Sequence, residues 1–318
     1  MTTYKEIFGK YVKNYSSDPT SDIEGQVWYN STTGVFKTNL NAGAAWASGG
    51  NLTTARNGLG GAGTQTVGLA FGGYTGTLQS ATEEYDGSAW TAGGSMGTAR
   101  KYFAGCGTQT AGLAAGGDAG PNSSATEEYD GSAWTGGGNL GTARRGLAGA
   151  GLQTAGLAFG GVVTTVSNAT EEYDGSAWTV GGNLGQARRY LAGCGTQTAG
   201  LAFGGANGTP YSNTEEYDGS AWTAGGNLNT AVKGPAGAGT QTAGLSIAGR
   251  TTVNVTNTEE YNGSSWTASA NLGTARYLLG GAGIQTAGLA VGGFATTFSA
   301  ATEEYTDPSF STKTITTS

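Results

Sequence analysis

The amino-acid sequence predicts an all-β protein built from six copies of one four-stranded sheet. A tyrosine recurs every 44 residues from Tyr85 to Tyr305, and a tryptophan five residues later keeps the same spacing through most of the chain. Each repeat is rich in glycine, lacks helical periodicity and contains four short strand-like segments separated by glycine turns. A fixed period of this length with four strands in each repeat is typical of a propeller blade. We therefore expect a six-bladed β-propeller with blades of 44 residues.

The third repeat illustrates the expected elements in chain order. A first strand of small residues, headed by an arginine, is expected at 143–151, and a second at 155–161 ends in a Gly-Gly pair. Eight variable residues then lead to a third strand at 170–173. The Asp-Gly pair at 174–175 predicts a tight turn into a fourth strand at 176–179.

The repeated arginine, Gly-Gly pair, tyrosine and tryptophan occur in the order found in the kelch repeat, which the chain resembles from about Ala45 to Tyr305. The resemblance implies blades of four antiparallel strands around a central channel, with the first strand innermost. The fifth repeat departs from the pattern, because Val232 replaces the arginine and Ala248-Gly249 replaces the Gly-Gly pair. We therefore expect no single arginine to be indispensable.

The repeated aromatic residues are expected to fill the space where neighbouring blades diverge, while small residues of the first strands meet near the axis. Each buried ring removes about 150–250 Å² from water, so this layer should dominate cohesion between blades. The predicted structural core consists of Trp46, Tyr85, Trp90, Tyr129, Trp134, Tyr173, Trp178, Tyr217, Trp222, Tyr261, Trp266 and Tyr305.

The two ends of the repeated segment predict how the ring of blades closes. The sixth repeat has no repeat-like tryptophan strand after Tyr305, whereas an isolated strand of this kind, around Trp46, precedes the first repeat. We expect the Trp46 strand to complete the last blade, which leaves no open sheet edge. The alternative is closure by residues 310–317, which also have strand composition.

The flanking residues suggest separate parts. Residues 1–40 do not fit the repeat and are predicted to form a short arm and a β-hairpin with its turn at 30–34. The propeller is expected over 41–310 and a C-terminal tail over 311–318. The hairpin either covers one end of the propeller or anchors it to a larger assembly.

Residues 18–37 resemble a segment that recurs in structural proteins of tailed bacteriophages, particularly marine ones. Kelch-like repeats behind such a segment resemble tail-fibre or other virion surface proteins. The resemblance implies a location on the virion, in several copies, with the N-terminal arm bound to other virion proteins and the propeller facing a host surface glycan or protein. The residues predicted to dock this N-terminal part to the virion are Tyr4, Phe8, Tyr11, Trp28 and Tyr29.

Comparison of the six repeats separates a constant scaffold from a variable surface. The turns after the first and third strands are nearly constant, whereas the eight residues after the Gly-Gly pair differ in every repeat. Loops held by a rigid scaffold commonly carry binding residues. The alternative is neutral variation at exposed loop tips. The candidate contact residues are Tyr74, Asp118, Asn122, Asn207, Tyr211, Arg250, Asn254 and Phe294.

The composition argues against catalysis. Histidine is absent, which excludes an imidazole base and a histidine-bound metal. Adjacent strand residues point to opposite faces, so a Glu-Glu pair cannot place two carboxylates on one face. We expect one glutamate of the pair to meet the arginine of the repeat and the other to face solvent. The sequence therefore predicts no catalytic residue, no metal and no cofactor.

Other ligands are also disfavoured. The net charge is −7 and no basic stripe occurs, which disfavours nucleic acid, and no apolar run is long enough to enter a membrane as a spanning helix. The Asp-Gly-Ser-Ala-Trp segment is faintly similar to the Asp-box of sialidase propellers. It lacks the residue between Asp and Gly, and no arginine cluster for a carboxylate ligand is evident.

Three other functions stay open at this point. The chain would be a decoration or adaptor protein if its propeller contacted only neighbouring virion proteins. It would be a bacterial kelch lectin if it acted outside a virion, and a glycan-active enzyme if the glutamates were catalytic.

Overall fold

The fold is all-β in the part of the chain that the structure, a computed structural model, describes. The described residues are 12–18, 26–40, 43–307 and 311–315. Within them every regular element is a strand and none is a helix. The chain divides into two compact units. We call Met1–Ala44 with Asp307–Ser318 the terminal unit, and Ala45–Thr306 the repeat region.

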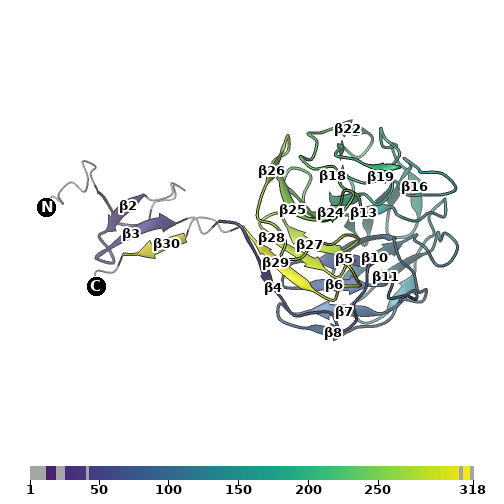
Figure 1. Ribbon diagram of the computed structural model, residues 1–318, viewed down its shortest axis with the longest axis horizontal. Helices are drawn as coiled ribbons and strands as arrows, with labels where there is room; N and C mark the ends of the chain where they lie inside the picture. The colour runs from purple at the N-terminus through teal and green to yellow at the C-terminus, as the bar shows by residue number, and fades with distance from the viewer. Residues whose placement is uncertain (1–11, 19–25, 41–42, 308–310, 316–318) are drawn as a thin grey trace. The chain divides into compact units, whose positions relative to one another are not determined.

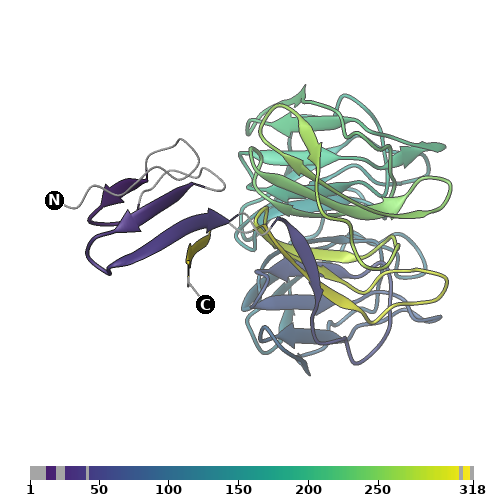
Figure 2. The ribbon, with the colours of Figure 1, turned by 60° about the vertical axis from the view of Figure 1, so that its left-hand side comes forward.

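The terminal unit contains one four-stranded sheet with the order β1-β2-β3-β30. β2 and β3 form the predicted hairpin, and the amide of Gly34 closes its turn by donating to the carbonyl oxygen of Asn30 (2.8 Å). β30 pairs antiparallel with β3 and lies beside it in both views (Figure 1 and Figure 2). The segment 311–318, predicted as a tail, thus supplies a strand. The strands are β1 (Lys13–Tyr15), β2 (Val27–Asn30), β3 (Val35–Leu40) and β30 (Ser311–Thr314).

The repeat region contains six four-stranded antiparallel sheets, which we number 1 to 6 in chain order. Sheet 1 contains β5 (Gly60–Gly63), β6 (Gly68–Phe71), β7 (Thr82–Tyr85) and β8 (Trp90–Ala92). Sheet 2 contains β9 (Ala104–Thr108), β10 (Ala111–Ala115), β11 (Thr126–Tyr129) and β12 (Trp134–Gly136). Sheet 3 contains β13 (Ala148–Leu152), β14 (Ala155–Phe159), β15 (Thr170–Tyr173) and β16 (Trp178–Val180).

The next two sheets follow the same order, and a short two-stranded pair is inserted in the fourth repeat. Sheet 4 contains β17 (Ala192–Gly195), β18 (Gly200–Phe203), β21 (Thr214–Tyr217) and β22 (Trp222–Ala224). The inserted strands are β19 (Ala206–Asn207) and β20 (Thr209–Pro210). Sheet 5 contains β23 (Ala236–Gly239), β24 (Gly244–Arg250), β25 (Asn254–Tyr261) and β26 (Trp266–Ala268).

Sheet 6 combines the two ends of the repeat region. Its fourth strand is β4, which pairs antiparallel with β29 and places Trp46 opposite Tyr305. The Trp46 strand therefore completes the last sheet, whereas the alternative C-terminal strand pairs with β3 in the terminal unit. Sheet 6 contains β27 (Gly280–Ile284), β28 (Ala287–Val291), β29 (Thr302–Thr306) and β4 (Ala45–Ser48).

The third repeat shows where the expected strand bounds differ from the observed ones. Its first strand begins at Ala148 and not at 143, because Gly146 adopts the left-handed conformation (φ 66°) and ends any extended run before it. The second strand ends at Phe159, since Gly160 and Gly161 both have positive φ. The residues ahead of each first strand therefore form turns, and these turns line the candidate site.

The first strands of neighbouring sheets contact one another in cyclic order, from β5 through β9, β13, β17 and β23 to β27, which contacts β5. β5, β13 and β27 lie near the middle of the repeat region, while β8, β16, β22 and β26 lie at its periphery (Figure 1). The central strands approach one another closely at their glycines: a Cβ at Gly61 would lie 2.6 Å from the carbonyl oxygen of Gly281. Glycine therefore permits the close approach of these strands.

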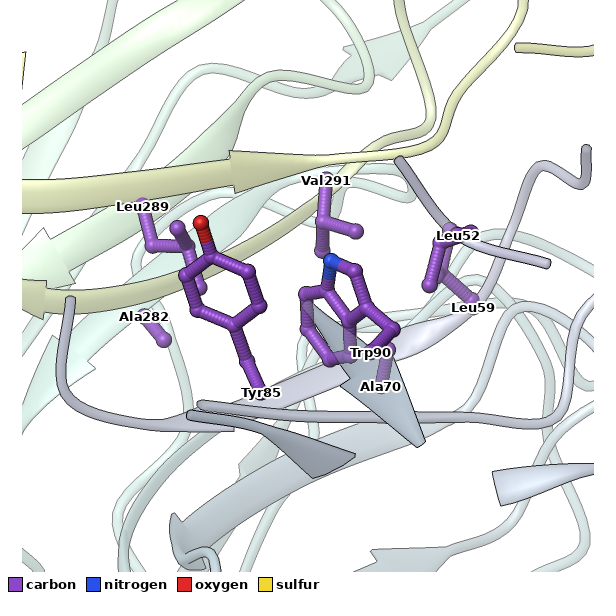
Figure 3. Close-up of a cluster of buried hydrophobic side chains, with 8 residues drawn as sticks. All are labelled: Leu52, Leu59, Ala70, Tyr85, Trp90, Ala282, Leu289 and Val291. Atoms are coloured by element: carbon purple, nitrogen blue, oxygen red, sulfur yellow. The ribbon is translucent and has the colours of Figure 1, made fainter. Parts of the chain in front are cut away.

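Aromatic rings fill the space between neighbouring sheets. Figure 3 shows Tyr85 and Trp90 of sheet 1 beside Leu289 and Val291, which belong to β28 of sheet 6. Tyr85 is fully buried and Trp90 is 6% exposed. Their ring centroids are 4.8 Å apart. The equivalent tyrosine of every sheet is also fully buried, so one aromatic layer is repeated around the region.

Each sheet is also joined to the preceding sheet by three repeated hydrogen bonds. Between sheets 2 and 1, the indole Nε1 of Trp134 donates to the hydroxyl of Thr82 (2.9 Å), and the hydroxyl of Tyr129 donates to the carboxylate of Glu84 (2.5 Å). Gln109 in the constant turn donates to backbone carbonyl oxygens of sheet 1. The same three bonds recur at every junction, including the one between sheets 1 and 6.

The two glutamates of each Glu-Glu pair have different partners. The first meets the arginine of its own repeat, as predicted: Nη2 of the fully buried Arg144 lies 3.1 Å from Oε1 of Glu171. Five sheets contain this ion pair. The glutamate that does not meet the arginine was predicted to face solvent, and this is wrong. Glu172 accepts the hydroxyl of Tyr217 from the next sheet, because the opposite face of the strand is covered by that sheet.

Sheet 5 replaces the arginine without losing the buried glutamate. Val232 occupies the arginine position, and Glu259 is 3% exposed. Asn229 compensates through its side chain, whose Nδ2 donates to the Glu259 carboxylate at 2.8 Å. Its backbone amide also donates to this carboxylate (2.7 Å), as the equivalent glycine amides do in the sheets that keep the arginine. Hydrogen-bond donors therefore take the place of the cation. Taken together, the described chain is an all-β structure of repeated four-stranded antiparallel sheets, as expected for a β-propeller.

The fifth repeat suggests a test of the buried ion pairs. Replacing Arg144 by valine should destabilise the protein by about 3–5 kcal/mol, because Glu171 would stay buried without a cation. Adding Gly141→Asn, which copies Asn229, should restore most of the loss through new hydrogen bonds to the carboxylate. Denaturant unfolding of both variants measures the difference. Equal stability of the single and double variants would contradict this role of the asparagine.

The tyrosine–glutamate bonds predict a loss of stability at alkaline pH. Burial, and then the hydrogen bond to a glutamate, raises the pKa of Tyr85, Tyr129, Tyr173, Tyr217 and Tyr261 from 10.0 to about 12. Because folding raises these pKa values, the stabilisation is complete below about pH 10 and declines as the pH rises through about 12. Denaturant unfolding across this range should show the decline. A Tyr173→Phe variant should show a smaller one, and identical pH profiles would refute the assignment.

Candidate binding face

Six residues spaced by 44 form a ring of backbone hydrogen bonds just ahead of the first strands. The amide of each donates to the carbonyl oxygen of its equivalent in the preceding sheet at 2.7–2.8 Å, and Gly58 of sheet 1 donates to Leu278 of sheet 6. All six have φ between 53° and 66°. We call them the ring residues: Gly58, Tyr102, Gly146, Tyr190, Gly234 and Leu278.

A cavity of about 130 Å³, which we call the ring cavity, is lined by the ring residues and by the residues that follow them. Tyr102 and Tyr190 contact each other edge to face beside it, with ring centroids 5.3 Å apart. A second cavity, of about 100 Å³, is lined by the far ends of the first strands and by Cys106 and Cys194. Both cysteines are free, and burial raises the pKa of both thiols, which keeps them protonated at neutral pH.

The variable loops lie on the side of the ring cavity. The first residue of each loop forms a β-bridge with the residue that precedes a ring residue, as in Asn57–Tyr74 and Lys101–Asp118. Because the strands are antiparallel, the loops after the second strand share this end of the sheets with the ring residues. The six loops therefore surround the ring cavity.

Several predicted contact residues join neighbouring loops to each other. The side-chain amides of Asn122 and Asn254 each donate to two backbone carbonyl oxygens of the following loop at 2.8–3.0 Å. The ring of Tyr74 meets Phe298 of sheet 6 with centroids 5.8 Å apart. Phe294 packs edge to face against Phe298, with ring centroids 5.6 Å apart. These residues therefore stabilise the arrangement of the loops, in addition to being candidate ligand contacts.

The remaining predicted contact residues differ in exposure. Asn207 is exposed beside the turn between β19 and β20, and Tyr211 is half-buried just after it. Asp118 accepts the amide of Gly120 (3.1 Å) within its own loop. Arg250 is half-buried and donates to the side-chain oxygen of Asn254 (3.4 Å).

The structure gathers a set of five cations, of which the sequence interpretation named Arg250 and missed the other four. The ring residues of sheets 2 to 5 are each preceded by a basic residue, and Arg250 pairs with Lys233 through a β-bridge. We call this set the cation belt: Lys101, Arg145, Arg189, Lys233 and Arg250. All other arginines of the repeat region are in the buried ion pairs. The 44-residue spacing of the first four belt residues is the pattern that would have revealed them.

The belt cations interact with neutral groups. Nζ of Lys101 lies 3.8 Å from the ring centroid of Tyr74, and Arg145 donates to the side-chain oxygen of Asn122 (2.9 Å). Within the described residues none of the five belt cations forms an ion pair with an acid. Burial raises the pKa of Tyr190, and the nearby charges of Arg189 and Arg145 oppose that rise. Lys101 and Arg189 also lie 5.1 and 5.3 Å from the ring centroids of Tyr102 and Tyr190, so positive charge lies beside the tyrosines at the mouth of the ring cavity.

The opposite ends of the sheets carry acids. Asp130, in the turn after the third strand, accepts the amides of Ser132 and Ala133 (2.8 Å). The backbone hydrogen bond from Ala133 is the largest effect that lowers the pKa of Asp130. Three other repeats have the same aspartate turn, and the fifth has Asn262. The repeat region is thus polarised, with cations around the ring cavity and carboxylates at the far turns.

The residues assigned to virion docking are only partly described. Trp28 is fully buried in the terminal unit, and its Nε1 donates to the carboxylate of Asp18 (3.2 Å). Tyr29 is half-buried against Phe36, with ring centroids 5.2 Å apart. The other three, Tyr4, Phe8 and Tyr11, lie outside the described residues. Trp28 therefore supports the fold of this unit and is not accessible as a direct contact.

Among the described residues, no three or more His, Cys, Asp or Glu side chains converge as a metal site. The described part of the chain also has no helix long and apolar enough to cross a membrane. Comparison with known proteins gives no relative: no protein-family model and no curated protein matches the chain.

The ring residues predict an unusual response to mutation. Tyr102, Tyr190 and Leu278 adopt a positive φ where the other three repeats have glycine, and this conformation costs an L-residue about 1–2 kcal/mol. Tyr190→Gly should therefore leave the free energy of unfolding within about 1 kcal/mol of the native value, because relief of strain offsets the lost ring contact. Denaturant unfolding measures this.

Phe159→Ala serves as the control for this prediction. Phe159 is fully buried, and its truncation should cost about 3–5 kcal/mol. A loss of that size for Tyr190→Gly would show that the tyrosine is a core residue.

Proposed function

We propose that the six sheets form a closed six-bladed propeller of the kelch type, which acts as a rigid, non-enzymatic binding platform. The cyclic hydrogen-bonded ring and the repeated junction between sheets 1 and 6 support the closure. A closed ring removes exposed sheet edges and fixes the loops relative to one another. Such rigidity limits the entropy that loops lose when a ligand binds.

The observation that carries the binding function is the contrast between the two ends of the sheets. The end with constant turns is capped by local aspartate hydrogen bonds. The other end combines variable loops, a cavity and half-buried cations that have no acidic partner in the described part of the chain. Half-buried cations that no acid neutralises are better suited to binding a partner than to stabilising the fold. This contrast favours the platform over a purely structural decoration protein.

We further propose that the platform belongs to the surface of a tailed-bacteriophage virion, in the tail, a fibre or the particle surface. This part rests on the resemblance of residues 18–37 to a segment of phage structural proteins. The terminal unit supports an attachment role, because it has its own sheet built from both ends of the chain. In this proposal the terminal unit contacts other virion proteins and the repeat region contacts the host surface.

Particle incorporation tests the virion proposal. The full chain, supplied in trans during phage assembly, should copurify with particles, whereas residues 45–306 alone should not, because they lack the terminal unit. A full chain carrying Arg145→Gln should be incorporated normally, since this residue lies on the binding face. Failure of the full chain to copurify would refute the virion location. Sugar binding by a chain that stays free of particles would favour the lectin alternative.

A further inference from the structure

We propose that the mouth of the ring cavity binds the acidic end group of a saccharide, with the carboxylate or phosphate of the sugar held by the cation belt. This inference rests on the binding platform proposed above and adds the chemical class of its ligand.

The charge distribution points to an anion. The repeat region has ten lysine and arginine residues; five are neutralised in buried ion pairs, and the other five form the cation belt. Asp118 is the single acid of the variable loops. Partial burial strengthens the attraction of the belt cations for an incoming anion, because they are less screened than exposed charges. A net positive mouth on a chain of net charge −7 is therefore a local, specific feature.

The size and lining of the cavity favour a sugar. Small-molecule pockets usually measure about 300–1,000 Å³. The ring cavity, at about 130 Å³, therefore accepts one end of a ligand while the rest lies across the loops. The phenol rings of Tyr102 and Tyr190 offer flat apolar surface with a polar edge, which suits the mixed surface of a sugar. Guanidinium groups of Arg145 and Arg189 suit planar carboxylate or phosphate groups.

A peptide ligand is less favoured by the backbone around the mouth. Extended peptides commonly bind by adding a strand to a free sheet edge. Here the amides and carbonyl oxygens of the ring residues are used by the ring itself, and the preceding residues are used by β-bridges to the loops. Side chains are therefore the main groups that this mouth offers to a ligand.

The strained tyrosines provide an independent indication. Glycine at 58, 146 and 234 makes the same backbone hydrogen bonds as Tyr102 and Tyr190, so the ring does not need a large side chain. Strained residues persist where a function requires them. The two tyrosines line the cavity, and Lys101 and Arg189 lie 5.1 and 5.3 Å from their ring centroids, which assigns the tyrosines to ligand contact beside the belt.

Isothermal titration calorimetry of the purified full chain tests the proposal. The acidic probes are galacturonic acid and glucose 6-phosphate, and their neutral counterparts are galactose and glucose. Each acidic sugar should bind at least about tenfold more tightly than its neutral counterpart, since hydrogen bonds to charged groups are stronger than those between neutral groups. Added salt should weaken binding of the acidic sugars.

Two sets of variants locate the site. Arg145→Gln with Arg189→Gln should lose the preference for acidic sugars. Tyr102→Gly with Tyr190→Gly should weaken binding of all four sugars while the chain stays folded, because three repeats already carry glycine at this position. Lys13→Gln, an exposed residue of β1 in the terminal unit, makes the same charge change and should bind like the native chain.

Several results would overturn the proposal. They are the absence of binding by both acidic sugars, equal binding of acidic and neutral sugars, and unchanged binding by the arginine variant. Tighter binding of a glutamate peptide or an oligonucleotide would assign the belt to another class of partner. Inorganic phosphate that binds as tightly as glucose 6-phosphate would remove the role of the sugar ring. Particle incorporation is measured separately, so these failures leave the virion proposal intact.

Discussion

Pairs of adjacent glutamates with opposite-facing side chains hold the repeat region together. In five sheets the first carboxylate is paired with a buried arginine of its own repeat, while the second accepts a tyrosine hydroxyl from the next sheet. The pleat of the strand produces this division, since neighbouring side chains point to opposite faces. A buried carboxylate without partners would cost several kcal/mol, so every sheet depends on its neighbour for a complete set of hydrogen bonds.

This dependence explains the distribution of side-chain size. Small residues occupy the central strands, because a Cβ at Gly61 would collide with the neighbouring backbone. Tyr85 and Trp90 lie between sheets farther out, where both rings are also hydrogen-bonded. The scaffold is therefore specified by a few residues in each repeat. The loops after the Gly-Gly pairs carry few of these constraints, which leaves them free to vary in sequence.

Charge is divided between scaffold and surface in the same way. Five arginines are fully buried and neutralised, whereas the cation belt is half-buried and, among the described residues, forms no ion pair with an acid. Arg144 and Arg145 show the division within two residues: the first is buried against Glu171, and the second points to the loop of sheet 2. One Arg-Arg dipeptide thus serves stability and the candidate site at once.

The sequence by itself determined the repeat, the four strands of each sheet, the hairpin near Trp28 and the partner of the Trp46 strand, because each follows from local pattern and from the period. Only the tertiary structure decided the role of the second glutamate, the pairing of 311–314 with β3 and the clustering of the belt cations. These features depend on which segments, distant in sequence, become neighbours in space. A period of 44 residues predicts equivalent positions, but the turn at Gly146 and its equivalents decides where the preceding side chains point.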